Sequence, residues 1–439
     1  MLTLILTFFT LLQPHALAST ADSAIFASED AQVCPGVRLP VKDPIPGETL
    51  PDDGSVWRVG TNRWNQDWET QYANFIVNNV GQDFLERFQI PADCTDLVMI
   101  VRAVFSRIHS LPFVLNDNTQ YLRFDSMQFR NTPTISRWSE TTWENDLKKD
   151  LRFTLFLNQI KSLIGSVNLP ESSYPKRIHS LNNSSELSPN ILPGTVFQYP
   201  EHTSLLARLE PDAPYFPLTE LASTAGVVIR ELEVYSTPMI RNAARDRGVV
   251  GFRWPVNCGK NFVLAPEKSM PDYSEEQYTM DLRGLSLGAY LESIVPGKRR
   301  GPDANLVQIK LAEIKSMIVR RLNLISQSND ILAKNKNAFK NHASNLYAQY
   351  STNDLDVAIF NQFNDLEKRI NGFTSAMTYY TGSLLTKYQI DLGTGKSIPY
   401  ETFRDALYRQ YSATGNKIDS PQIVGADPND SVERRWGLK

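Results

Sequence analysis

One cysteine and one histidine of this 439-residue chain have types and positions suited to nucleophilic chemistry. Cys94 stands at the expected start of an apolar helix, where unpaired backbone N–H groups and the positive end of the helix dipole favour a thiolate. Asp93 and Asp96 flank the thiol and oppose that charge, so a nearby imidazolium is needed. His202, which opens a strand-like segment, is the best supplier. The pair predicts nucleophilic catalysis by a Cys94 thiolate, with His202 as its acid–base partner.

A helix must position Cys94, and the sequence predicts one from Cys94 to a point before Pro112. Asp93 is a suitable N-cap, and Asp96 stands three residues later, as in a capping box. The backbone N–H groups of the first turn could then stabilise an oxyanion. The apolar stripe of this helix consists of Leu97, Val101, Val104, Phe105 and Ile108.

Strands must position the histidine. Residues 194–198, 202–209 and 227–235 are short, rich in β-branched or aromatic residues, and separated by Pro, Asp and Gly. If 202–209 pairs antiparallel with 227–236, a residue near the end of the second strand lies opposite His202. Glu233 and Tyr235 share one strand face with Glu231. Either could accept the imidazole N–H, and Glu233 is the preferred third catalytic residue.

The segment Asp93-Cys94-Thr95-Asp96-Leu97, followed by Leu192-Pro193-Gly194-Thr195-Val196-Phe197 and then by His202, resembles the NlpC/P60-like papain-fold cysteine hydrolases. In that family an Asp-Cys pair opens the helix, a Pro-Gly-Asp strand follows, and the base histidine starts the next strand. Thr195 stands where the family usually has Asp, and the interval between cysteine and histidine requires an insertion. The resemblance implies cleavage of amide bonds in cell-wall peptides, with no metal or organic cofactor.

Two other functions remain open. Residues 284–288 fit the Gly-x-Ser-x-Gly pattern of a serine hydrolase, with Ser286 as nucleophile, His342 as base and Asp303 or Asp330 between them. That motif requires a buried strand directly before it, and residues 278–283 are too polar for one. The other alternative is a non-catalytic binding or scaffold protein of the cell envelope with a degenerate papain-like fold.

The N-terminus indicates export. Residues 1–18 read as a signal peptide, with a short uncharged apolar run and a small-x-small pattern ending at Ala18. We expect a periplasmic or secreted protein that does not span the membrane, because no other apolar run is long enough. In an oxidising compartment Cys34 and Cys258 are candidates for a disulfide, which would leave Cys94 free.

The expected fold class is α+β, with a papain-like helix packed on an antiparallel sheet. A Pro-rich extended lead-in covers 19–56, the papain-like domain covers 57–296 with an insertion at about 114–190, and a helical region covers 297–439. Within the domain, helices are also expected at about 67–88 and 142–164. In the helical region, Asp303 caps a long helix, and 355–386 and 401–411 are further helical segments.

Composition limits the partners. The formal charge of −3, from 45 basic and 48 acidic residues, provides no overall field for nucleic acid. Three cysteines and five histidines are too few and too scattered for a zinc module. The resemblance to the cell-wall hydrolases implies a peptide or peptidoglycan as the partner. Residues 297–350 carry more Lys and Arg than Asp and Glu, which indicates either a solvated helix face or contact with an anionic envelope surface.

Overall fold

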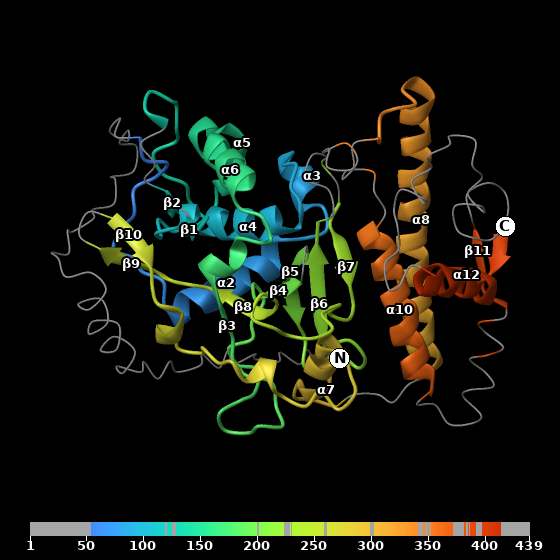
Figure 1. The fold of residues 1–439 in the computed structure, drawn as a ribbon. Coiled ribbons are helices and arrows are strands. Elements are labelled where there is room, and N and C mark those ends of the chain that lie inside the picture. Colours follow the sequence, from blue (N-terminus) through green and yellow to red (C-terminus); the bar gives the residue numbers. More distant parts are fainter. Residues whose placement is uncertain are drawn as a thin grey trace, which may run out of the picture.

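A six-stranded antiparallel sheet with the strand order β3-β8-β4-β5-β6-β7 lies at the centre of this computed structural model (Figure 1). Helices cover both of its faces, so the expected α+β class is confirmed. The structure describes residues 54–118, 121–124, 129–199, 202–223, 229, 231–258, 261–298, 303–340, 346, 350, 353–371, 382, 385, 387–391 and 397–413.

The sheet strands are β3 (Ser173–Pro175), β4 (Val196–Tyr199), β5 (His202–Leu209), β6 (Leu218–Ala222), β7 (Glu233–Tyr235) and β8 (Gly248–Phe252). Three hairpins lie outside this sheet and comprise β1 (Val114–Asn116) with β2 (Tyr121–Arg123), β9 (Pro255–Cys258) with β10 (Asn261–Leu264), and β11 (Gln389–Asp391) with β12 (Ser397–Pro399). The helices are α2 (Gln66–Asn79), α3 (Phe84–Phe88), α4 (Cys94–Ile108), α5 (Trp143–Lys149), α6 (Leu151–Leu163), α7 (Leu287–Ile294), α8 (Ala304–Lys334), α10 (Asn353–Asn371) and α12 (Tyr400–Ala413).

The largest apolar core lies between one face of the sheet and the helices α2 to α6. Helix α4 is buried along almost its whole length and packs against β5. Leu205 and Ala207 of β5 point into this core, as do Val196 of β4 and Leu221 of β6. This face of the sheet therefore positions the start of α4, where Cys94 lies.

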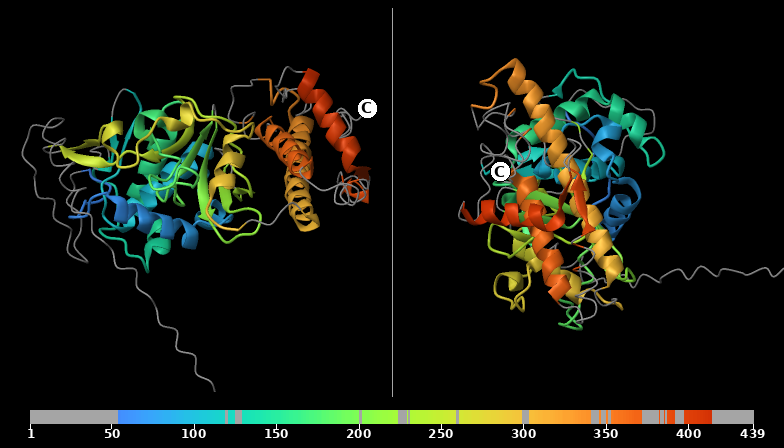
Figure 2. Two further views of the ribbon diagram at one scale, coloured as in Figure 1. Left: turned by 90° about the horizontal axis from the view of Figure 1, so that it is seen from below. Right: turned by 90° about the vertical axis from the view of Figure 1, so that its right-hand side faces the viewer.

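The opposite face of the sheet is covered by α7 and by a group of three later helices. Leu206 of β5 and Phe197 of β4 pack with α7 in one core. Ala222 and Tyr235, near the β7 edge, pack with α8, α10 and α12 in another. Figure 2 shows these three helices gathered at one end of the molecule. The helical region expected after residue 297 is thus present, and it docks on the sheet.

Several predicted helices are confirmed, with changed boundaries. Asp93 caps α4 and forms the predicted capping box with Asp96, and Asp303 caps α8. The segment expected as one helix over 67–88 is two helices, because α2 ends at Asn79 before Gly81. The segment expected over 142–164 is divided at Asp150, which ends α5 and caps α6.

The predicted pairing of β5 with the segment 227–236 is wrong. β5 pairs with β6, and β7 pairs with the other side of β6. The strand β6 was not predicted, because its sequence Leu-Thr-Glu-Leu-Ala has no aromatic residue and only one β-branched residue. The signal peptide, most of the lead-in, Cys34 and His342 lie outside the described residues, so the predictions made for them stay predictions.

Candidate functional site

Cys94 is the first residue of α4, as predicted, and is partly exposed. The N–H of Asp96 donates to Asp93 Oδ1 at 2.8 Å, and the N–H of Asp93 donates to Asp96 Oδ2 at 3.0 Å. The thiol sulfur lies 3.9 Å from Thr95 Oγ1. The predicted helix start is therefore formed, with Cys94 in its first turn. The carboxyl groups of Asp93 and Asp96 that cap it flank the thiol in the sequence.

Those two carboxyl groups determine the electrostatics around Cys94. Asp96 is buried, and burial together with the charge of Asp93 raises its pKa to about 7. Lys161, whose Nζ donates to the Pro91 carbonyl at 2.8 Å, opposes this rise only in part. A negative charge on the thiol would be added to an already acidic helix start, so a positive partner is needed for activation.

The strand residue that faces the start of α4 is Thr203. Its Oγ1 lies 3.3 Å from Oγ1 of Thr95, and both residues are buried. Side chains alternate along a strand, and Leu205 and Ala207 share the core with α4. Thr203 belongs to the same set, so a hydroxyl rather than an imidazole contacts the residue next to Cys94.

His202 lies on the other face of the sheet. It is the cross-strand partner of Tyr199, and the two ring centroids are 5.6 Å apart. Tyr199 donates its hydroxyl to Oε1 of Glu220 at 2.8 Å, and the Met239 N–H donates to Oε2 at 3.0 Å. Burial raises the pKa of Glu220, and the nearby His202 opposes that rise. The predicted Cys94 and His202 pair is therefore not brought together, because the alternation of β5 turns the imidazole away from α4.

Glu233, the predicted third residue, lies on β7 and is separated from β5 by β6. Its Oε1 forms an ion pair at 2.7 Å with Arg320 of α8. Tyr235, the other possibility, is buried in the core with α8. The prediction that one of them orients His202 assumed a neighbouring strand, and the intervening β6 removes that arrangement.

The other described histidines do not replace His202. His109 follows the last residue of α4. It is thus some 20 Å from Cys94, given a rise of about 1.5 Å per residue. His179 is hydrogen-bonded through Nε2 to the Tyr290 hydroxyl of α7 at 2.8 Å. Among the residues that the structure describes, none supplies an imidazole beside the Cys94 thiol.

The serine motif has a structural role. Ser286 caps α7, and its Oγ accepts from the Ala289 N–H at 3.2 Å. No strand directly precedes it within the described residues, and Gly284 has a positive φ of 75° in a turn. At Gly288 a Cβ atom would collide with the carbonyl of Pro238. Both glycines of the motif are thus explained by backbone geometry rather than by a nucleophile elbow.

Ser286 nevertheless lines a cavity of about 700 Å³, which we call the junction cavity. Its walls are α7, α10 and the loop that follows β7. Both apolar and polar side chains line it. The cavity is lined by Tyr215, Thr237, Pro238, Met239, Arg241, Gly284, Leu285, Ser286, Ala289, Glu292, Ser293, Leu306, Phe360, Asn361, Gln362, Asn364, Asp365, Lys368 and Arg369.

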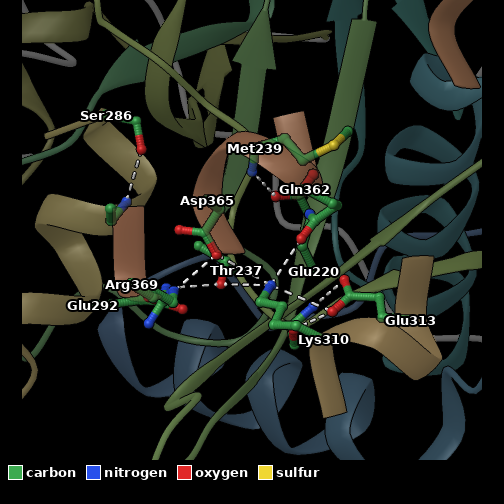
Figure 3. A network of polar contacts seen from close by, with 12 residues as sticks. Glu220, Thr237, Met239, Ser286, Glu292, Lys310, Glu313, Gln362, Asp365 and Arg369 are labelled. Atoms are coloured by element: carbon green, nitrogen blue, oxygen red, sulfur yellow. Dashed lines mark hydrogen bonds and ion pairs between the residues drawn. The ribbon is translucent and has the colours of Figure 1, made fainter. Parts of the chain in front are cut away.

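A buried ionic network joins residues of the cavity lining to Lys310 of α8 (Figure 3). Lys310 of α8 is fully buried and donates to Thr237 Oγ1 at 3.0 Å and to Gln362 Oε1 at 2.8 Å. Its Nζ also lies 3.4 Å from a carboxylate oxygen of Asp365, and the guanidinium of Arg369 is ion-paired with both Asp365 and Glu292. The network joins α7, α8 and α10 to the loop after β7.

The sequence held one signal for this network. Lys310 follows Leu306 by four residues and precedes Leu311 and Ile314, so it falls on the apolar face of a predicted helix. A lysine there needs partners when the helix is buried. The partners are far away in the chain, and the sequence alone could not identify them.

Comparison with protein-family models, curated proteins and solved structures gives no match for this chain. Across the described part of the chain, no helix combines the length and apolar character needed to cross a bilayer. A group of metal-ligating side chains is likewise not found among the described residues.

Proposed function

We propose that this protein is a non-catalytic binding protein of the cell envelope, which holds its ligand in the junction cavity. The observation that carries the proposal is the orientation of β5, where Thr203 faces the start of α4 and His202 faces the opposite side. The export and envelope parts of the proposal depend on the signal-like residues 1–18 and on the resemblance to cell-wall hydrolases.

A degenerate papain-like fold is part of the same proposal. Helix α4 begins at the cysteine and packs on β5, and β4 and β5 follow each other as adjacent antiparallel strands. These features support the relationship. Thiol hydrolases need a base within hydrogen-bond reach of the sulfur, directly or through one water. Here the described contact of the Cys94 sulfur is with the hydroxyl of Thr95 at 3.9 Å, and the carboxyl groups of Asp93 and Asp96 disfavour a thiolate.

The junction cavity supports binding rather than catalysis. Its volume of about 700 Å³ lies in the range of small-molecule sites, which combine apolar walls with a few placed polar groups. Phe360, Met239 and Leu285 supply apolar surface, while Glu292 and Lys368 supply charge. No histidine or cysteine belongs to its described lining, so a Cys-His pair is not assembled there.

The first test separates binding from hydrolysis. Purified protein is incubated with soluble peptidoglycan fragments, and the products are followed by mass spectrometry. We expect no amide cleavage, and we expect Cys94→Ser to bind as the unmodified protein does. Cleavage that disappears in both Cys94→Ser and His202→Ala would establish the cysteine hydrolase and overturn the proposal.

The second test locates the binding site. The protein is pelleted with insoluble peptidoglycan, and the bound fraction is compared with that of Ala289→Trp, which fills the junction cavity. The same replacement at the exposed Ala312 of α8 is the matched control. We expect Ala289→Trp to lose at least tenfold in affinity and Ala312→Trp to retain it. Equal binding by both variants, or no binding by the unmodified protein, would count against the proposal.

A further inference from the structure

We propose that the edge of the central sheet at β7 binds an extended, basic peptide segment of another protein, which adds to the sheet as a further strand. β7 is the last strand in the order β3-β8-β4-β5-β6-β7, so one of its edges has no partner strand among the described residues. A cavity of about 660 Å³ lies along this edge. We call it the edge groove, and its lining consists of Gln82, Glu86, residues 231–236 and residues of α8. It shares no residue with the junction cavity, so the inference goes beyond the proposed function.

The backbone of β7 presents an unpaired donor and an unpaired acceptor to the edge groove. The N–H of Leu232 donates to the Gln82 carbonyl at 2.7 Å, and the N–H of Ser236 donates to Oε1 of Glu313 at 3.1 Å. Neither acceptor belongs to β6, and backbone groups two residues apart in a strand point to the same edge. The N–H and C=O of Val234 therefore also point away from β6, and no described group bonds to them there. An added strand forms its hydrogen bonds with such groups.

Apolar side chains beside this edge are exposed to solvent. Val234, Ile309 and Val319 are 39%, 43% and 42% exposed, and all three line the edge groove. Ile309 and Val319 belong to α8, whose buried side packs against α10. A peptide strand in the groove would cover these side chains with every second residue, because alternate side chains of a strand point to opposite faces. Exposed apolar surface next to an unpaired strand edge is typical of a peptide-binding site.

The charges of the edge groove indicate a basic peptide. Glu86 and Glu231 line it, are exposed, and have no ion-pair partner among the described residues. Arg320, the one basic residue of the described lining, is ion-paired with Glu233 at 2.7 Å. Glu313 is likewise paired with a buried lysine of α8. The unpaired charge of the groove is therefore negative, and lysine or arginine side chains of a peptide would complement it.

A second copy of this chain is a poorer occupant. Pairing of two β7 edges about a twofold axis would bring the same surface of both copies together. The carboxylates of Glu86 and Glu231 would then meet their own counterparts, and like charges in an interface disfavour association. A peptide with basic side chains among apolar ones matches both the backbone groups and the charge.

Fluorescence anisotropy with two labelled peptides tests the charge preference. One peptide alternates valine and arginine, and the other has glutamate in place of each arginine, so length and apolar content are the same. We expect the arginine peptide to bind at least tenfold more tightly, with an affinity that falls as salt is added. This comparison uses the unmodified protein and does not depend on the folding of any variant.

Two replacements of Val234 test the addition of a strand. Val234→Pro removes the outward N–H, and proline is tolerated in an edge strand where its N–H would face away from the sheet. Val234→Thr keeps the N–H and the β-branched shape. We expect Val234→Pro to weaken the arginine peptide at least tenfold and Val234→Thr to change its affinity less than twofold. Circular dichroism compares the folding of the two variants.

A second pair of variants tests the carboxylates. We expect Glu231→Gln to weaken the arginine peptide at least threefold. Asp67→Asn, which removes an exposed carboxylate of α2 outside the edge groove, should leave the affinity unchanged.

Four results would overturn the inference. Equal affinities for the two peptides, or no binding of the arginine peptide, would reject the basic ligand. Equal affinities of Val234→Pro and Val234→Thr would reject the added strand. A dimer that sedimentation detects and Val234→Pro abolishes would assign the edge to a second copy of this chain. Binding that appears only after removal of residues 414–439 would assign it to a segment of this chain instead of another protein.

Discussion

Asp96 lies buried at the start of α4, next to Asp93 and Cys94, and its pKa is raised from an ordinary 3.8 to about 7. The folded protein therefore holds this proton at pH values where the unfolded chain has lost it. The free energy of unfolding falls as pH rises from about 4 to about 7 through this group. Asp96→Asn keeps a capping acceptor and removes the titration. We expect it to raise the unfolding free energy by about 1–3 kcal/mol at pH 8.

Urea denaturation of the unmodified protein and Asp96→Asn at pH 5 and pH 8 measures this effect. The variant should lose part of the pH dependence and gain stability mainly at pH 8. Asp67→Asn, which removes an exposed carboxylate from the first turn of α2, is the control. An Asp96→Asn protein that is less stable than the original at both pH values would show that the carboxylate stabilises the helix start instead.

At the same scale, the alternation of side chains along β5 explains why the predicted residues Cys94 and His202 are not brought together. The sequence correctly placed Cys94 at a helix start, because capping and apolar periodicity are local signals. It could not decide whether His202 or Thr203 faces α4. Strand β5 is buried on both faces, so its hydrophobic pattern carries no alternation from which to read the register.

At the scale of elements, Asp150 shows how one side chain can join two helices and a buried cation. It is fully buried and accepts from Phe153 N–H at 3.1 Å, from Trp138 Nε1 at 3.1 Å, and from Thr134 Oγ1 at 2.9 Å. The guanidinium of Arg107 also lies 3.4 Å from its carboxylate, inside the core. The sequence predicted one helix over 142–164, because Thr134, Trp138 and Arg107 lie outside that segment and gave no local sign that Asp150 separates two helices.

We expect Asp150→Ala to destabilise the protein by about 3–5 kcal/mol, because it removes a cap and leaves Arg107 buried without its carboxylate. Asp146→Ala is the matched comparison, since Asp146 lies four residues earlier and accepts from the exposed Thr142 hydroxyl at 2.6 Å. That variant should lose about 1 kcal/mol or less. Thermal and urea denaturation give both values, and equal losses would contradict the role assigned to Asp150.

At the scale of the whole molecule, the helical region is held to the sheet by the network around Lys310. The sequence predicted α8 and its cap, but not its docking, because Thr237, Gln362 and Asp365 meet Lys310 only in the folded chain. Apolar contacts of Tyr235 and Ala222 with α8 and α10 complete the junction. The junction cavity exists only while this docking persists, so the proposed binding depends on it.

Lys310→Met tests that dependence, since methionine keeps an unbranched apolar stem and removes the charge. The change removes the buried cation beside Glu313 and leaves Asp365 paired with Arg369 alone, at an expected cost of about 3–5 kcal/mol. Hydrogen exchange should then accelerate in α8 and α10 while α4 stays protected, and the fraction of protein that pellets with peptidoglycan should fall in parallel. Lys315→Met, at an exposed position of α8, should change neither. Faster exchange spread evenly over α4 and α8 would mean that sheet and helical region unfold as one unit, and the network would then stabilise the whole protein rather than the junction.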